Sequence, residues 1–395
     1  MKAYKYYLLV GFVLTFLIGC FFYFSPRIGE AVGNDSLEIF HDDYEVGVYE
    51  DRGSWAITRD FPYKSQFEEY PELAVWFFGS IHLLKGPLDY MLVFYIVMGL
   101  FMFGVFWLTL VLLKHFNKSY LLAFLMFLPS SIFFVFNRFD IVPVFFVLLS
   151  LYLLFKSKYK ISFLLLAIAF LLKWFAVVLV PIYICYIFFK HKKIKKTLLP
   201  ILLFVLPVVA VFGTTILGAG LEAFLSPYQF HMARTCEFGN IWGTINFYFS
   251  DNFTGQNFFC SKVTTVLQLF VPLLLFIIFI LKRKKLTDKD VLLWSFIMIV
   301  LFVFFSRLYS NQWLIWFSPL LILLIKDKID VILLVAFDVI NWLLFPVLPR
   351  HIPFIENNNF LFPLHVYNFL SVLLMILLIT IVIKIYENNN HHPDI

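Results

Sequence analysis

The segment that decides the fold class is residues 89–113, DYMLVFYIVMGLFMFGVFWLTLVLL, which carries no charged side chain after Asp89. A transmembrane α-helix needs about 20 consecutive, mostly apolar residues to cross the hydrocarbon core of a bilayer. This segment meets that requirement, and apolar runs of similar character recur along the whole chain. We therefore predict an all-α, polytopic integral membrane protein.

The composition excludes the main soluble classes of protein. Of the 395 residues, 62% are hydrophobic and only 14% are charged, whereas soluble chains carry about 25% charged residues. This excludes a soluble enzyme, a disordered chain and a small disulfide-stapled scaffold. The first apolar run, residues 8–24, is too long for a signal peptide and has no small-residue cleavage site after it, so we predict a retained span.

We predict one membrane domain over residues 1–395, with about twelve spans. Several predicted spans are shorter than an upright helix requires, so they should be buried among their neighbours or end at a water-filled cavity. The twelve predicted spans are residues 8–24, 89–113, 119–136, 141–155, 161–173, 174–189, 197–217, 262–281, 290–306, 313–325, 330–348 and 364–385.

Short lysine-rich segments set the predicted orientation. With the N-terminus in the cytoplasm, these segments fall on the cytoplasmic side and most acidic residues fall outside, as the positive-inside rule expects. Both termini are then cytoplasmic, and residues 25–89 and 219–261 form two long extracytoplasmic loops with short interfacial helices.

Cys236 and Cys260 flank a polar part of the second loop and are either disulfide-bonded or free. The cytoplasmic loops are too short for a nucleotide-binding domain and contain no glycine-rich phosphate motif, which argues against an ATP-driven pump.

The first outer loop gathers carboxylates. We predict that one of them, near Asp43, lies at the mouth of a cavity between spans, where partial burial raises its pKa and lets it take a proton from an incoming hydroxyl. Asp43 is the first choice for this catalytic role, with Asp42 and Glu45 beside it. The other carboxylates of the loop are interpreted as a solvated acidic surface: Glu50, Asp51, Glu68 and Glu69.

Five basic groups on the same side are predicted to bind a lipid phosphate. Arg and Lys at membrane spans face a cavity or a partner, and Arg grips phosphate oxygens in pairs. The five are Arg138, Lys173, His231, Arg234 and Arg307. The alternative role of Lys173, which interrupts an apolar stretch, is to snorkel toward headgroups. Acid and cations together predict an outward-opening groove in which a sugar leaves a polyprenyl phosphate, with the cations stabilising the departing phosphate.

Polar residues outside these groups are interpreted one by one. Trp242 either stacks on a sugar face or belongs to the aromatic belt of the membrane interface. His41 and His231, with the nearby aspartates, raise the question of a divalent cation, but no ligand spacing supports one, so no obligatory metal or cofactor is predicted. Asp338, inside a predicted span, is interpreted as a hydrogen-bonding partner of a neighbouring helix.

Several short motifs follow one another in order along the chain. After the carboxylates come Val48–Tyr49, Pro62–Tyr63 and Tyr70–Pro71–Glu72–Leu73. The later motifs are Asn137–Arg138–Phe139–Asp140–Ile141–Val142–Pro143, Lys173–Trp174–Phe175, and Ser310–Asn311–Gln312–Trp313–Leu314–Ile315–Trp316–Phe317–Ser318–Pro319. In this order and spacing the chain resembles the multispanning GT-C glycosyltransferases, most closely glycosyltransferase family 87, the polyprenyl-phosphate-mannose-dependent mannosyltransferases.

The resemblance implies a helical bundle of GT-C type and an inverting hexosyltransferase, most simply a mannosyltransferase, that acts on the extracytoplasmic side of the cell membrane. The donor would be a polyprenyl-phosphate-linked sugar and the acceptor a lipid or a glycan. We expect a monomer surrounded by membrane lipids, with no nucleic-acid partner. Together with Trp242, the predicted substrate-binding residues are Tyr49, Tyr63, Tyr70, Asn137, Asp140 and Gln312.

The chain departs from the family pattern at informative positions. Glu72 and Ala176 stand where the pattern has prolines. Counting back from Val48–Tyr49 places Glu45 at the catalytic acid of the family, whereas Asp43–Tyr44–Glu45–Val46 matches the Asp-Tyr-x-Val pattern of the related glycosylphosphatidylinositol mannosyltransferases. The identity of the base is therefore open between Asp43 and Glu45.

Two other functions would use similar features. A transporter or flippase of a lipid-linked saccharide would line its path with the same charges, but the internal repeat of spans expected of such a protein is not found in the sequence. A polymerase or ligase of surface polysaccharides would share the basic second loop without requiring the acidic first loop. We expect the transferase.

Overall fold

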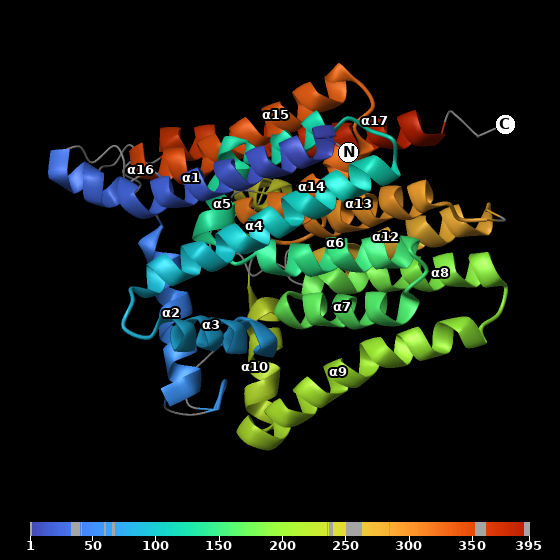
Figure 1. Ribbon diagram of the computed structural model, residues 1–395, viewed down its shortest axis with the longest axis horizontal. Coiled ribbons are helices and arrows are strands. Elements are labelled where there is room, and N and C mark those ends of the chain that lie inside the picture. Colours follow the sequence, from blue (N-terminus) through green and yellow to red (C-terminus); the bar gives the residue numbers. More distant parts are fainter. Residues whose placement is uncertain are drawn as a thin grey trace. The chain divides into compact units, whose positions relative to one another are not determined.

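The described part of the chain is entirely helical (Figure 1). The structure is a computed structural model and describes residues 2–32, 40, 42–58, 61–64, 68–234, 236, 240–249, 263–283, 285–351 and 361–390. No strand occurs among these residues. The predicted all-α class is thus confirmed for this part of the chain.

Seven helical segments of the described residues are long and apolar enough to cross a membrane. They are Ala3–Ala31 in α1 (Lys2–Val32), α4 (Tyr90–His115), Trp174–His191 formed by η3 (Trp174–Leu179) and α8 (Val180–His191), α9 (Lys195–Ala219), α12 (Thr264–Leu281), Lys328–Val347 formed by α15 (Lys328–Trp342) and η6 (Leu343–Val347), and His365–Asn388 in α17 (Leu361–Asn390). An eighth span results if η2 (Tyr120–Phe127) and α5 (Pro129–Asn137), bent by 64° at their junction, cross as one. Seven or eight such helices indicate a multi-pass membrane protein.

The other predicted spans coincide with shorter helices. These are α6 (Ile141–Phe155), α7 (Tyr159–Leu172), α13 (Asp288–Phe304) and α14 (Leu314–Leu324). Every residue of α14 is buried, which a helix of 11 residues requires because it is too short to face lipid across a bilayer. Each apolar run is therefore helical, and the count of twelve spans stays a prediction.

The chain folds as two compact units. Unit 1 comprises residues 1–124 and 133–231, and unit 2 comprises residues 125–132 and 232–395. In unit 1, α6 packs against α7 and α4, α7 against α9, and α1 against α4. In unit 2, α12, α13 and α14 pack in sequence, while α15 packs against α17.

Helices also form inside the two predicted outer loops. The first loop contains α2 (Asp43–Thr58) and α3 (Glu72–Lys85), and the second contains α10 (Leu221–Ala233) and α11 (Ile241–Phe249). α2 and α3 pack closely in unit 1. A Cβ atom at Gly53 would lie 2.5 Å from the carbonyl of Phe78, so the close approach of the two helices requires glycine there.

An aromatic core fixes α2 and α3 to the rest of unit 1. The ring of Tyr49 stacks on Phe78 with centroids 4.6 Å apart, and Phe78 meets the edge of Phe139 at 4.9 Å. Phe94 of α4 stacks on the other side of Tyr49 at 5.7 Å. All four side chains are buried. Since aromatic pairs contribute about 0.5–1.5 kcal/mol beyond the burial of their area, this core holds the start of α2 beside the segment that precedes α6.

Asp338 of α15 caps another helix within unit 2. Its carboxylate accepts hydrogen bonds from the backbone N–H groups of Ser130 and Ser131 at 2.8 and 3.0 Å, and from the hydroxyl of Ser131 at 2.7 Å. These are the first N–H groups of α5, which have no acceptor inside the helix. The side chain amide of Asn341, one turn later, donates to the hydroxyl of Ser130. The hydrogen-bonding role expected for Asp338 is confirmed.

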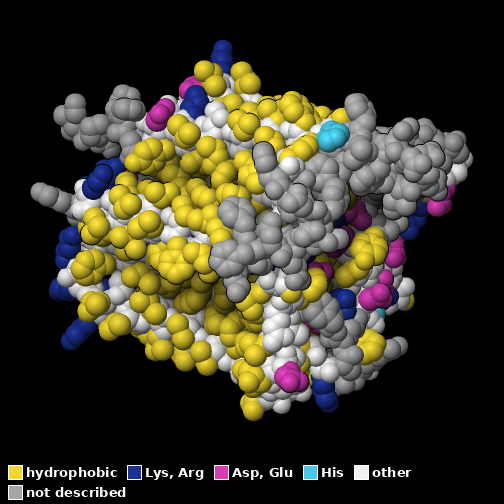
Figure 2. All heavy atoms as spheres, turned by 180° about the vertical axis from the view of Figure 1, so that it is seen from behind, with side chains coloured by type: hydrophobic (Ala, Val, Ile, Leu, Met, Phe, Trp, Pro, Cys, Tyr) yellow, Lys and Arg dark blue, Asp and Glu magenta, His cyan; other side chains and the backbone are white. Residues whose placement is uncertain are grey.

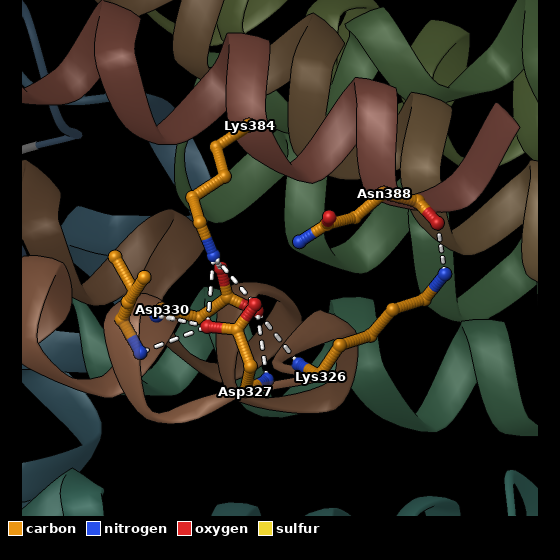
Figure 3. A network of polar contacts seen from close by, with 6 residues as sticks. Lys326, Asp327, Asp330, Lys384 and Asn388 are labelled. Carbon is orange, nitrogen blue, oxygen red and sulfur yellow. Dashed lines mark hydrogen bonds and ion pairs between the residues drawn. The ribbon is translucent and has the colours of Figure 1, made fainter. Parts of the chain in front are cut away.

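A second polar cluster joins α15 to α17 (Figure 3). The ammonium group of Lys384 lies 2.8 Å from Asp327 and 2.5 Å from Asp330, and Lys326 donates to the backbone carbonyl of Asn388. Asp327 also caps the N-terminus of α15. Asp330 is buried whereas Asp327 is exposed, so the pairing with Asp330 contributes more of the stabilisation.

Replacement of Asp338 by alanine should destabilise the protein by about 2–4 kcal/mol, because it leaves two buried N–H groups and a hydroxyl without their acceptor. Thermal melting of the purified protein in detergent measures this effect. Asp51→Ala, at an exposed position of α2, is the matched control and should melt like the wild type. Equal melting temperatures for Asp338→Ala and Asp51→Ala would show that the cap contributes no stability.

Candidate functional site

Asn137 fixes the beginning of α2 to the end of α5. Its side-chain oxygen accepts a hydrogen bond from the backbone N–H of Asp42 at 3.0 Å. Its amide nitrogen donates to the carbonyl groups of Phe40 and Phe133, at 3.2 and 3.0 Å. Asn137 is fully buried. The residue predicted to bind substrate therefore holds together the two segments that carry the first acid and the first cation of the site.

Arg138 and Asp42 form the first ion pair. The guanidinium of Arg138 lies 2.7 Å from the carboxylate of Asp42, and the two side chains are 7% and 14% exposed. A second nitrogen of Arg138 donates to the carbonyl of Asn137 at 2.8 Å. A charge-assisted bond of this length between poorly hydrated groups is strong and directional. It holds the cation in place at the start of α2.

Lys173 and Asp140 form the second ion pair. The ammonium group lies 3.0 and 3.1 Å from the two carboxylate oxygens, and Asp140 is fully buried. The same ammonium lies 4.6 Å from the ring centre of Phe139. Lys173 ends α7 in an extended conformation, which turns its side chain toward the segment before α6. A buried carboxylate thus pairs with the charge of Lys173, and the alternative in which Lys173 snorkels toward headgroups stays a prediction.

Glu45 lies in the first turn of α2, within the electrostatic field of both pairs. Burial raises the pKa of its carboxyl group, Arg138 and Lys173 oppose this shift, and Asp42 and Glu69 add to it. The hydroxyl of Tyr70 donates a long hydrogen bond of 3.4 Å to Glu45. Among the described residues no cation forms an ion pair with this carboxylate. Glu45 is therefore a carboxylate of raised basicity beside two held cations.

For Asp43 the structure describes the backbone alone, and it does not describe His41. Asp43 begins α2, but its side chain is outside the described part of the structure, as is the whole of His41. Of the two candidate bases, only Glu45 has a side chain within the described part of the structure, so the choice between Asp43 and Glu45 stays open.

The three tyrosines predicted to bind substrate all lie in unit 1, and one of them contacts Glu45. Tyr70 contacts Glu45 directly. The hydroxyl of Tyr63 donates to the backbone carbonyl of Tyr70, and Tyr63 itself has a left-handed backbone with φ of 70°. Tyr49 is fully buried in the aromatic core, where its hydroxyl has no hydrogen-bond partner among the residues that the structure describes. Of the three, Tyr70 has the geometry for a direct part in the site, while Tyr63 and Tyr49 support it.

His231 extends the site to the end of α10. Its Nε2 atom lies 3.0 Å from the carbonyl oxygen of Glu69, and its ring meets the edge of Trp174 at 5.4 Å. Trp174 in turn stacks on Tyr228 of α10 at 4.9 Å. Because Trp174 follows Lys173 directly, this aromatic stack lies next to the second ion pair.

The remaining predicted residues belong to unit 2. Arg307 donates to the carbonyl groups of Met232 and Arg234, at 2.6 and 2.9 Å, and to the hydroxyl of Thr265. Burial lowers the pKa of Arg307. The indole N–H of Trp242 donates to the carbonyl of Phe304 at 2.8 Å. A phosphate at Arg307 would have to displace carbonyl acceptors, and a sugar at Trp242 would meet only the face of its ring.

Gln312 and Arg234 complete the set in unit 2. Gln312 is half-buried in the short helix η5 (Asn311–Trp313), and Arg234 is half-buried after the end of α10. Cys236, two residues after Arg234, is disulfide-bonded, whereas Cys20 and Cys185 are free thiols. Cys260, the partner considered from the sequence, lies outside the described residues.

Two carboxylates near the site, Glu68 and Glu72, are buried, which the sequence did not predict. Glu68, expected to be solvated, is only 1% exposed and lies 3.6 Å from Arg52 of α2. That expectation was wrong because Glu68 is enclosed where α2 packs on α3. Glu72, at the first position of α3, is also buried, and burial raises its pKa. An acid in place of a proline at that position was the one sequence signal for this burial.

The expectation for the other loop acids is confirmed in part. Asp51 is exposed, and Glu50 is half-buried in an ion pair of 2.8 Å with Lys85. Within the described ranges, no group of three or more His, Cys, Asp or Glu side chains is placed to hold a metal ion.

Glu68 predicts a pH dependence of stability. Burial raises its pKa from 4.5 to about 7 against the opposing effect of Arg52. The folded protein then holds this proton more tightly than the unfolded chain, so stability should fall as pH rises from about 4.5 to about 7, by on the order of 3 kcal/mol. Glu68→Gln should remove this decline, which melting curves of the two proteins at pH 5 and pH 8 measure. Parallel pH profiles for the variant and the wild type would show that Glu68 titrates normally.

Comparison with protein-family models and with curated protein sequences finds no match for the chain. The assignment of a function therefore depends on the site in unit 1 and on the motif resemblance.

Proposed function

We propose that this chain is an inverting glycosyltransferase that moves a hexose, most simply mannose, from a polyprenyl-phosphate donor to a hydroxyl of a lipid or glycan acceptor on the extracytoplasmic side. The observation that carries the proposal is the placement of Glu45 beside two cations, each held by its own aspartate. A base and a stabiliser of negative charge are the two groups that this reaction needs.

Glu45 is the proposed base. Its carboxylate takes the proton of the acceptor hydroxyl as the hydroxyl oxygen bonds to the anomeric carbon, and the bond from that carbon to the phosphate oxygen breaks. The electron pair of the broken bond leaves with the phosphate. One base without a covalent intermediate corresponds to inversion at the anomeric carbon. Asp42 suits this role less well, because its carboxylate is engaged with Arg138 at 2.7 Å.

Arg138 and Lys173 are the proposed stabilisers of the leaving phosphate. Asp42 and Asp140 hold them in fixed positions before the reaction begins, so little reorganisation is needed as charge develops. In this proposal the two aspartates are positioning residues. His231, which contacts Glu69 and Trp174 within unit 1, is proposed to add a donor contact at the end of α10.

The disulfide at Cys236 supports an extracytoplasmic site. Disulfides persist in oxidising compartments and are rare in the cytosol. Residues 219–261 are the segment that the charge pattern assigns to the outside, so two independent features agree on the side of the membrane. A lipid-linked donor is the form of activated sugar that reaches that side without a cytoplasmic nucleotide.

Glu45→Gln should lower the rate of sugar transfer by about 10²–10⁴-fold, the usual contribution of a general base. The assay is transfer of radiolabelled mannose from polyprenyl-phosphate mannose to a host lipid extract by the purified protein. Asp51→Asn, an exposed carboxylate on the same helix, is the matched control and should keep wild-type activity. In the wild type the rate should rise with pH through the raised pKa of Glu45, because only the ionised carboxylate accepts a proton. Loss of transfer in Asp43→Asn with full activity in Glu45→Gln would move the base to Asp43.

A double variant tests the second ion pair as a donor contact. Lys173→Met alone leaves a buried carboxylate unpaired, which costs about 3–5 kcal/mol, so Asp140→Asn is combined with it. The double variant should fold and should raise the KM for the donor by about tenfold or more, the value of one charged hydrogen bond, with the KM for the acceptor unchanged. An unchanged donor KM in the folded double variant would remove Lys173 from donor binding.

A further inference from the structure

A dense group of lysines lies at the end of unit 1 where α6 meets α7 and α8 meets α9. We call it the lysine face and define it by its eight exposed lysines: Lys156, Lys158, Lys160, Lys190, Lys192, Lys193, Lys195 and Lys196. No Asp or Glu occurs anywhere from residue 141 to residue 221. The chain therefore supplies no carboxylate from these four helices to neutralise the face.

Side-chain bonds hold the two lysine-rich turns together. The ammonium of Lys190 donates to the hydroxyl of Ser157 at 3.2 Å, and the ring of His191 lies 3.0 Å from the hydroxyl of Tyr159. These contacts join positions more than 30 residues apart in the sequence. Like charges held close together repel one another unless an anion lies between them. The positive-inside rule explains the sign of these charges, but it does not require the two turns to be tied together.

Exposed apolar side chains border the lysines. Ile161 is 51% exposed, Phe188 41%, Ile194 65% and Leu198 56%. In Figure 2, dark-blue side chains line the lower left edge, over the ends of α8 and α9, beside yellow ones and with no magenta among them. A soluble anion would contact the cations alone. A phospholipid has both an anionic phosphate and acyl chains, so it matches both parts of this surface.

We propose that the lysine face binds the headgroup phosphate of an anionic phospholipid, with the acyl chains against the apolar border at Ile161, Phe188, Ile194 and Leu198. Clusters of four to eight basic residues next to a membrane helix attract anionic lipids in this way. This site is independent of the proposed transferase reaction and lies at the end of α6 and α7 opposite to Asp140 and Lys173.

The test uses the full-length protein purified in a zwitterionic detergent and titrated with phosphatidylglycerol or phosphatidylcholine. Retained lipid is counted by native mass spectrometry, and the melting temperature is followed in parallel. Phosphatidylglycerol should be retained and should raise the melting temperature, whereas phosphatidylcholine should do neither. Equal retention of the two lipids would overturn the proposal. So would an equal rise in melting temperature with inorganic pyrophosphate, because the face would then select a soluble anion.

Two charge-matched variants locate the site. Lys160→Gln, Lys193→Gln, Lys195→Gln and Lys196→Gln together should weaken retention of phosphatidylglycerol at least about tenfold. The control removes the same number of charges between the end of α12 and the first turn of α13 in unit 2, by Lys282→Gln, Arg283→Gln, Lys285→Gln and Lys289→Gln, and should retain the lipid like the wild type. Equal weakening in both variants would mean that net charge alone attracts the lipid, which would overturn the site. The lipid and pyrophosphate comparison on the wild type decides the proposal even if a variant fails to fold.

Discussion

Arg138 and Lys173 are held away from water by Asp42 and Asp140, and the candidate site depends on this pairing. Burial of an unpaired cation lowers the stability of the fold by several kcal/mol, and burial of an unpaired carboxylate lowers it by a similar amount. The two aspartates meet that cost and also fix the cations to specific segments: Asp42 holds Arg138 at the start of α2, and Asp140 holds Lys173 at the start of α6. Because the two charges of each pair offset one another, Glu45 is a remaining ionisable group in the same field, and we propose it as the base. Its partial burial, with no ion pair to a cation in the described part of the chain, makes it more basic than a carboxylate in water.

The surroundings of these pairs explain why the first loop folds as two helices. Tyr49, Phe78 and Phe139 bury their rings between α2, α3 and the segment before α6, and Asn137 ties the backbone of Asp42 to α5. Apolar packing thus brings α2 to the bundle, and the polar contacts set where its first turn lies. Glu68 and Glu72 are enclosed by the same packing. A loop rich in acids becomes a folded part of unit 1 because its aromatic residues pack against the spans.

Much of this arrangement was predictable from the sequence, and the exceptions have physical causes. Apolar run length predicted the helices closely, as in 89–113 for α4, since the bilayer sets that length. The polar residue inside a span, Asp338, was rightly expected to bond a neighbouring helix, although its partners at Ser130 and Ser131 lie some 200 positions away. The pairing of Lys173 with Asp140 was not foreseen, because both had been considered as ligands of substrate. The burial of Glu68 was missed for a different reason: the packing of other segments around a carboxylate decides whether it meets water, and composition contains no such information.

α6 and α7 run between the Asp140–Lys173 pair and the lysine face, so their lengths set the distance between these two parts of unit 1. α6 begins beside Asp140 and ends at the lysine face, and α7 returns from that face to Lys173. At 1.5 Å per residue, helices of 14 and 15 residues are about 21–23 Å long, whereas the hydrocarbon core of a bilayer is about 30 Å thick. If the lysine face lies at the headgroups of the inner leaflet, the end that carries Asp140 and Lys173 lies several ångströms below the outer headgroups. Charges at that depth require partners, as both of these have. A hydrophilic sugar would not reach that depth alone, whereas a sugar attached to a polyprenyl phosphate is carried there by its own lipid chain.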